Sequence, residues 1–167
     1  TYNGSLTAPT NAGSYAVVAA VDDPNYTGAA TGTLTVAKAA ATVTLADLTP
    51  TYDGTPKPVT ATTAPAGLTV TLTYDGNATA PTNAGSYSVA GTVADANYSG
   101  SASGTLVIAK AVATVTLGGL NQTYDGTPKP ASATVNPADQ AVTLTYDGSA
   151  TVPTNAGSYA VVATVNT

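Results

Sequence analysis

The chain has 167 residues, a formal net charge of -5 and only 8% charged residues. It contains no Cys, Met, Trp, Phe or His, and it also lacks Glu and Arg, so every acid is Asp and every base is Lys. Most catalytic centres and metal sites need His, Cys or a tuned Glu, so this composition predicts no enzyme and no bound cofactor. The acidic balance argues against nucleic-acid binding, and no apolar run is long enough to span a membrane.

The sequence repeats itself every 72 residues without an insertion. The landmarks that recur at this spacing include Tyr2, Tyr74 and Tyr146, and also Gly13, Gly85 and Gly157. The segment TYDGTPKP at 51–58 returns at 123–130 with the same offset. A fixed period of this length is typical of tandem modules.

The first predicted elements are a loop at 9–13 and a strand that begins near Tyr15. From this Tyr the apolar residues alternate through Val17, Ala19 and Val21, which is the period of a half-buried strand. The Gly-x-Tyr start resembles the tyrosine corner of immunoglobulin-like sandwiches, where a Tyr at the start of a late strand bonds back to nearby backbone. We expect core and corner roles, rather than a sugar-binding surface, for Tyr15, Tyr87 and Tyr159, with Gly13, Gly85 and Gly157.

The module boundaries are predicted at the Ala-Lys-Ala steps at 37–39 and 109–111, where one apolar stretch ends and a new alternating one begins. On this division, 1–38 is the C-terminal half of a module, 39–110 is a complete module, and 111–167 is the N-terminal part of the next. Because the outer segments match only parts of the unit, we expect the chain to be a stretch of a longer array.

Within the complete module, alternation predicts strands at 42–45, 68–74, 87–93 and 105–108, and Asp-Gly pairs suit the turns between strands. We expect five to seven short strands per module and no helix. The predicted fold is all-β, with tandem small antiparallel β-sandwich modules of immunoglobulin-like type, and a β-grasp-like sheet is the alternative. The side chains expected to share one core are Val43, Leu72, Tyr87, Val89, Leu106 and Ile108.

Two kinds of charged residue suggest sites. Asp22, Asp23 and Asp95 are calcium candidates, but they lack the dense D-x-D spacing of dedicated loops, so turn formation is the preferred role. The four Lys residues could form isopeptide crosslinks. We do not favour this chemistry, because the Lys of Pro-Lys-Pro is expected to be exposed and the Lys of Ala-Lys-Ala to lie at a module junction.

The motifs YDGTPKP, LTYDG, APTNAGSY and GTL-x-(V/I)-x-K follow one another at fixed spacing. This series resembles the MBG or YDG-type repeat domains of large bacterial surface proteins, which are adhesin-like or haemagglutinin-like. The resemblance covers the whole chain and implies a secreted, extracellular protein of the cell surface. It transfers no catalytic residue, because the family has no established catalytic motif.

We therefore expect a structural stalk of an extracellular bacterial adhesin or surface fibre, built as beads on a semi-rigid rod. Its expected partners are neighbouring modules of the same chain, with a glycan or host-surface ligand bound through a distal domain. Two alternatives remain open. The repeats could themselves bind glycan or a host protein, or identical chains could assemble laterally into a filament.

Overall fold

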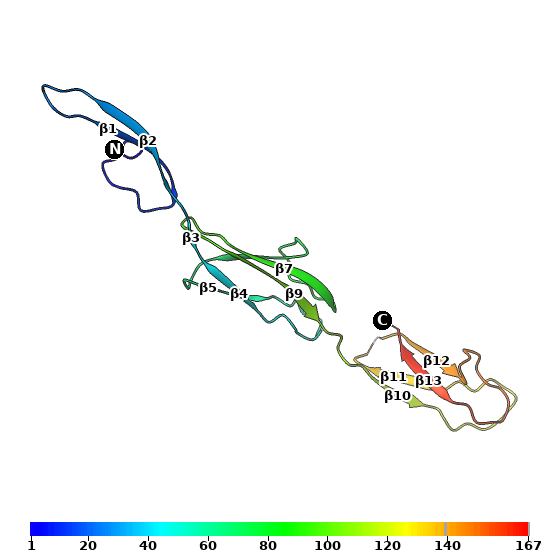
Figure 1. Ribbon diagram of the computed structural model, residues 1–167. Coiled ribbons are helices and arrows are strands. Elements are labelled where there is room, and N and C mark those ends of the chain that lie inside the picture. The colour runs from blue at the N-terminus through cyan, green and yellow to red at the C-terminus, as the bar shows by residue number, and fades with distance from the viewer. Residues whose placement is uncertain (139, 167) are drawn as a thin grey trace. The chain divides into compact units, whose positions relative to one another are not determined.

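The computed structural model describes residues 1–138 and 140–166, and all its regular elements are strands (Figure 1). The chain divides into two compact units, Thr1–Lys110 and Ala111–Thr167. Unit 1 holds β1 (Gly13–Ala20), β2 (Ala29–Val36), β3 (Ala39–Ala40), β4 (Thr42–Ala46), β5 (Thr60–Ala64), β6 (Val70–Tyr74), β7 (Gly85–Val93), β8 (Tyr98–Ser99) and β9 (Ser101–Ile108). Unit 2 holds β10 (Thr114–Gly118), β11 (Ser132–Asn136), β12 (Val142–Tyr146) and β13 (Val161–Val165). The all-β prediction is confirmed.

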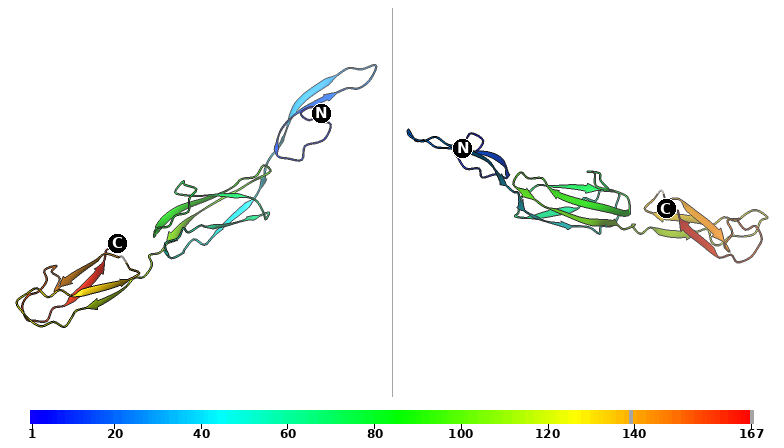
Figure 2. Two further views of the ribbon diagram at one scale, coloured as in Figure 1. Left: turned by 180° about the vertical axis from the view of Figure 1, so that it is seen from behind. Right: turned by 45° about the horizontal axis from the view of Figure 1, so that its top comes forward.

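Residues 39–110 form a module of two facing sheets (Figure 2). One is the antiparallel sheet β6-β7-β9, and the other is the antiparallel pair β4-β5. Leu45 of β4 and Leu48 just after it pack against the buried cluster that includes Val89 and Leu106. Two layers that enclose one apolar core are the arrangement expected of a sandwich, and they fit the immunoglobulin-like prediction better than a single grasp-like sheet.

The segment after β4 crosses from one sheet to the other. Leu48 accepts a hydrogen bond from the amide of Val107 at 2.8 Å, and Pro50 accepts one from the amide of Ala109 at 2.9 Å. Thr51 then pairs with Ala109 in the parallel direction. The segment therefore supplies hydrogen-bond partners to the end of β9 and covers that edge of the larger sheet.

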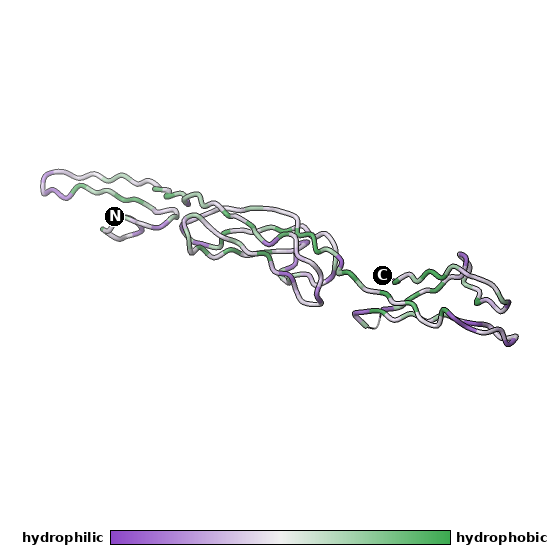
Figure 3. The backbone as a smooth tube through the Cα atoms, turned by 90° about the horizontal axis from the view of Figure 1, so that it is seen from below, coloured by the Kyte–Doolittle hydropathy of each residue, from purple (hydrophilic) through white to green (hydrophobic). Residues whose placement is uncertain are grey.

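The core of the module consists of Val59, Tyr74, Val89, Leu106 and Ile108. Three of these were predicted from alternation, and the predicted Leu72 and Tyr87 lie half-buried against the cluster. Val43 is buried as predicted, although it lies outside the contact cluster formed by the other core residues. Figure 3 shows apolar residues along the strands and hydrophilic ones in the connecting loops.

The 72-residue period of the sequence is also a period of the structure. β1 and β2 pair as β7 and β9 do, with Tyr15 opposite Leu34 in one pair and Tyr87 opposite Leu106 in the other. The burial differs, because no described strand packs broadly against β1 and β2. Leu34 is 37% exposed, whereas Leu106 is fully buried.

The segment directly after the boundary at Lys38 is part of a sheet within the module 39–110. β3 pairs with β8 in the parallel direction. The amide of Ala39 donates to the carbonyl of Asn97, and the amide of Ala41 donates to the carbonyl of Ser99, both at 2.8 Å. Only two residues, Ala37 and Lys38, separate β2 from β3. The link is thus an ordered, extended strand.

Candidate functional site

The three predicted corner tyrosines all make the same hydrogen bond. Each hydroxyl donates to the carbonyl of the Asn four residues earlier, at 2.8 Å for Tyr15, 2.9 Å for Tyr87 and 3.1 Å for Tyr159. The ring lies close over the glycine two residues earlier: a Cβ built at Gly85 would come within 3.2 Å of the Tyr87 hydroxyl. Glycine at this position therefore lets the ring fold back onto its own loop, as a tyrosine corner requires.

A second set of tyrosines, whose structural role the sequence did not reveal, is more deeply buried. Tyr74 and Tyr146 are each 5% exposed. The Tyr74 hydroxyl accepts a hydrogen bond from the amide of Val59, and the Tyr146 hydroxyl accepts one from the amide of Ala131, both at 2.8 Å. These bonds fasten the segments that precede β5 and β11. The available signal was the recurrence of Tyr in LTYDG, but alternation alone cannot show what a hydroxyl reaches.

The YDGTPKP motif forms a compact charged turn. Asp53 accepts hydrogen bonds from the amide and hydroxyl of Thr55, at 2.9 and 2.6 Å, and it forms an ion pair with Lys57 at 2.5 Å. The Lys57 amide also donates to the carbonyl of Pro81 at 2.9 Å. The expectation that this Lys is exposed is wrong, because its side chain is only 15% exposed against the loop that contains Pro81.

The same turn occurs at Asp125, Thr127 and Lys129 with matching distances. In both turns the hydrogen bond from the Lys, followed by those from the Thr hydroxyl and amide, holds the pKa of the Asp well below its usual 3.8. Every donor around the carboxylate thus stabilises its charged form. The turns are held together by charge-assisted hydrogen bonds.

This pKa shift gives a pH prediction. Because the folded state lowers the pKa of Asp53, the turn contributes stability above pH 3.8, and that contribution is lost as the pH falls below this value. Side-chain carboxyl NMR is expected to show Asp53 and Asp125 still ionised below pH 3.8. In Lys57→Met the titration of Asp53 is expected to move up, while that of Asp125 stays in place as the internal control. Equal behaviour of the two carboxyls in this variant would contradict the assigned cause.

The calcium candidates lie in two equivalent loops. Asp23 accepts a hydrogen bond from the amide of Asn25 at 2.7 Å. Asp95 accepts from the amides of Asn97 and Tyr98 at 2.7 and 2.9 Å. Asp22 is exposed. Within residues 1–138 and 140–166, no three acidic side chains gather as a metal site would need.

The exposed Tyr26 is the strongest candidate for a sugar-stacking ring, at 72% exposure. Its equivalent Tyr98 is half-buried and pairs with Ala39 of the link strand. In the module that follows a link, this position is therefore part of the junction. Tyr26 lacks the strand pairing that covers Tyr98, so its large exposure does not by itself identify a binding surface.

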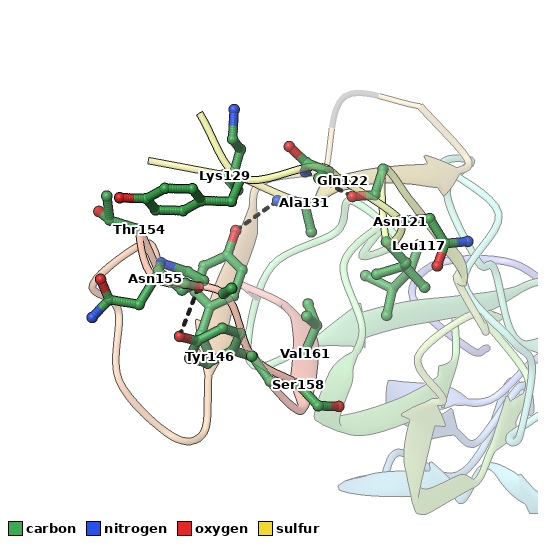
Figure 4. A pocket seen from close by; sticks show the side chains of 17 residues that line it. Leu117, Asn121, Gln122, Lys129, Ala131, Tyr146, Thr154, Asn155, Ser158 and Val161 are labelled. Atoms are coloured by element: carbon green, nitrogen blue, oxygen red, sulfur yellow. Dashed lines mark hydrogen bonds between the residues drawn. The ribbon is translucent and has the colours of Figure 1, made fainter. Parts of the chain in front are cut away.

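A cavity of about 620 Å³ lies within unit 2 (Figure 4). Its apolar wall includes Leu117, Leu120, Tyr159 and Val161. The residues at the equivalent positions of the module 39–110 are Leu45, Leu48, Tyr87 and Val89, which pack around β9 through Leu106 and Ile108. The described part of unit 2 contains no counterpart of β9. The cavity therefore corresponds to the face that β9 covers in the complete module.

Several polar groups at this cavity are bonded within the unit. The hydroxyl of Tyr146 accepts from Ala131, that of Tyr159 donates to Asn155, and Lys129 pairs with Asp125. Figure 4 shows the first of these bonds at the cavity wall. These recurring side chains thus connect loops to strands within the unit.

The comparison with known families identifies the repeat. The model of the MBG domain matches residues 1–40, 41–112 and 113–167, which together are the whole chain. The chain belongs to the MBG domain family. The predicted resemblance to MBG repeats is confirmed. The first two matched segments end at residues 40 and 112, two residues after the module ends predicted from the sequence. No curated protein and no solved structure matches the chain significantly. The described residues contain no helix that is long and apolar enough to cross a membrane.

Proposed function

We propose that these MBG modules form part of the stalk of an extracellular bacterial adhesin or surface fibre. The repeats act as spacers that carry a distal ligand-binding domain away from the cell, and they perform no catalysis. Three family matches in one unbroken 72-residue register support a repeat role. The low charge is usual for secreted bacterial repeat modules, and without Cys each module must hold together through packing alone.

The observation that carries the proposal is the ordered link between 1–38 and 39–110. Only Ala37 and Lys38 separate β2 from β3, and the amides of Ala39 and Ala41 donate to Asn97 and Ser99 within the second module. A flexible Gly/Ser link would let neighbouring modules rotate, and the span of the array would then grow only with the square root of its length. A link built into a sheet instead transmits direction and tension from one module to the next.

Small-angle scattering on arrays of two, four and six copies of residues 39–110 tests the spacer function. We expect the maximum dimension to rise in equal steps of roughly 30–40 Å per module, because strands of six to eight residues at about 3.3 Å each set the length of a module. A rise with the square root of module number would contradict the proposal.

A parallel glycan array and host-protein pull-down with the two-module protein separate the spacer from a binding repeat. The spacer proposal expects no signal from either. Reproducible binding would assign the ligand-binding role to the repeats themselves. Lateral assembly into filaments would appear in the scattering data as a mass above that of one chain.

A further inference from the structure

The side chain of Asn97 joins two modules. Its Oδ1 accepts a hydrogen bond from the amide of Ala12 at 2.8 Å, and its Nδ2 donates to Oδ1 of Asn11 at 3.1 Å. Asn11 and Ala12 belong to the loop that leads into β1, which is 85 residues earlier in the chain. One amide side chain thus uses both its acceptor and its donor on a single loop of the preceding module.

The loop that presents Asn97 is fixed from within. Asp95 holds the amides of Asn97 and Tyr98 through its carboxylate, so the Asn97 side chain projects from a turn with a set geometry. The backbone carbonyl of Asp95 in turn accepts a hydrogen bond from the Lys38 ammonium at 2.7 Å. Preorganisation of this kind lowers the entropy lost on docking.

The fit is also steric. Gly100 closes the same loop, and a Cβ at this position would come within 2.0 Å of the carbonyl oxygen of Ala41. The link strand can approach the loop only because residue 100 has no side chain. Asp, Asn and Gly recur with the same spacing at Asp23, Asn25 and Gly28, and the Asn-Ala pair recurs at 83–84 and 155–156.

We propose that the loop 95–100 is a docking site for the Asn-Ala pair of the preceding MBG module, and that the equivalent loop 23–28 binds the same pair of another module. The partner is defined by its chemistry. Its backbone amide donates to the side-chain oxygen of the receiving Asn, and its own Asn side-chain oxygen accepts from the side-chain nitrogen of the receiving Asn. This contact would fix the angle between modules whichever role the array serves. It does not depend on the stalk proposal.

Amide hydrogen exchange on the full chain tests the docking of Asn97. In Asn97→Ala, the Ala12 amide is expected to exchange roughly tenfold faster, since its acceptor is lost. The Tyr98 amide, held by Asp95, is expected to keep its protection and so to show that the loop remains folded. Asn25→Ala is the matched control, and it is expected to leave Ala12 unchanged.

Three results would overturn the proposal for Asn97. The first is an Ala12 amide that is already unprotected in the parent chain. The second is an equal effect of Asn97→Ala and Asn25→Ala on this amide. The third is a joint loss of protection at Ala12 and Tyr98 in Asn97→Ala, which would mean that Asn97 only supports its own loop. A double-mutant cycle with Asn11→Ala adds a second readout. The exchange rates of the two single variants are expected to combine non-additively, and strict additivity would contradict a direct contact.

The proposed role of the loop 23–28 is tested in a longer chain, in which Asn25 has a preceding module to contact. In an extended chain, residues 39–110 followed by 39–72 are placed ahead of Thr1, so that MBG modules now precede Asn25. Asn25→Ala is then expected to speed exchange of the Ala amide in the Asn-Ala pair of the module just before it, by the same roughly tenfold factor. An Asn25→Ala variant without this gain of effect would show that the repeated loop does not bind the same partner.

Discussion

Replacing Leu106 with alanine is expected to destabilise the module 39–110 by about 2–5 kcal/mol, most of the stability of a small module. Leu106 is fully buried among Val59, Tyr74, Val89 and Ile108, and Leu45 and Leu48 cover it from the facing sheet. Truncation removes apolar contacts and leaves a cavity between two sheets that are fixed by their own hydrogen bonds. The neighbouring side chains can therefore fill the space only in part.

The matched control is Leu34→Ala, at the equivalent position of the repeat. Leu34 lies opposite a Tyr on its partner strand, as Leu106 does, but it is 37% exposed, so its truncation is expected to have a clearly smaller effect. Residue-resolved amide exchange at Val89 and Val17 reports the two strand pairs separately within one chain. Equal effects of the two truncations would show that the facing sheet adds little to the burial of Leu106.

Replacing Gly100 with alanine is expected to open the link between residues 1–38 and the module 39–110. The added Cβ would meet the oxygen of Ala41 at 2.0 Å and its carbonyl carbon at 2.9 Å. Both are backbone atoms, so no rotamer change relieves the clash, and β3 must separate from β8. Overpacking of a rigid site costs about 1–3 kcal/mol, and a backbone clash of this depth is expected to reach the upper end of that range.

The readout is exchange at the amides of Ala39 and Ala41, which donate across this link. Both are expected to lose protection in Gly100→Ala. Gly28→Ala is the control, because a Cβ at Gly28 would meet only a methyl group of Val21 at 3.4 Å, an ordinary contact. If Gly100→Ala left both amides protected, the close approach of the link would not exist in solution.

The sequence by itself determined the repeat, the strand class and the corner residues, because these depend on local patterns. Alternation from Tyr87 to Val93 predicts a strand that the structure extends to Gly85–Val93. The strand Thr60–Ala64 was not among the predicted ranges, because its small side chains, TATTA, give little contrast between faces. Turn residues and the 72-residue spacing were sufficient to indicate the MBG family, which the family match confirms.

Only the tertiary structure decided which of these patterned residues are buried and which connect modules. Leu34 and Leu106 occupy the same place in the repeat. Leu106 is a core residue because a second sheet faces it, whereas Leu34 has no such sheet and stays partly exposed. Lys57 is covered by a loop 24 residues away, at Pro81, and Asn97 reaches a loop 85 residues earlier. Periodicity records which side of a strand a residue occupies. It contains no information on what lies opposite that side, because packing between sheets and between modules is set by contacts far apart in the chain.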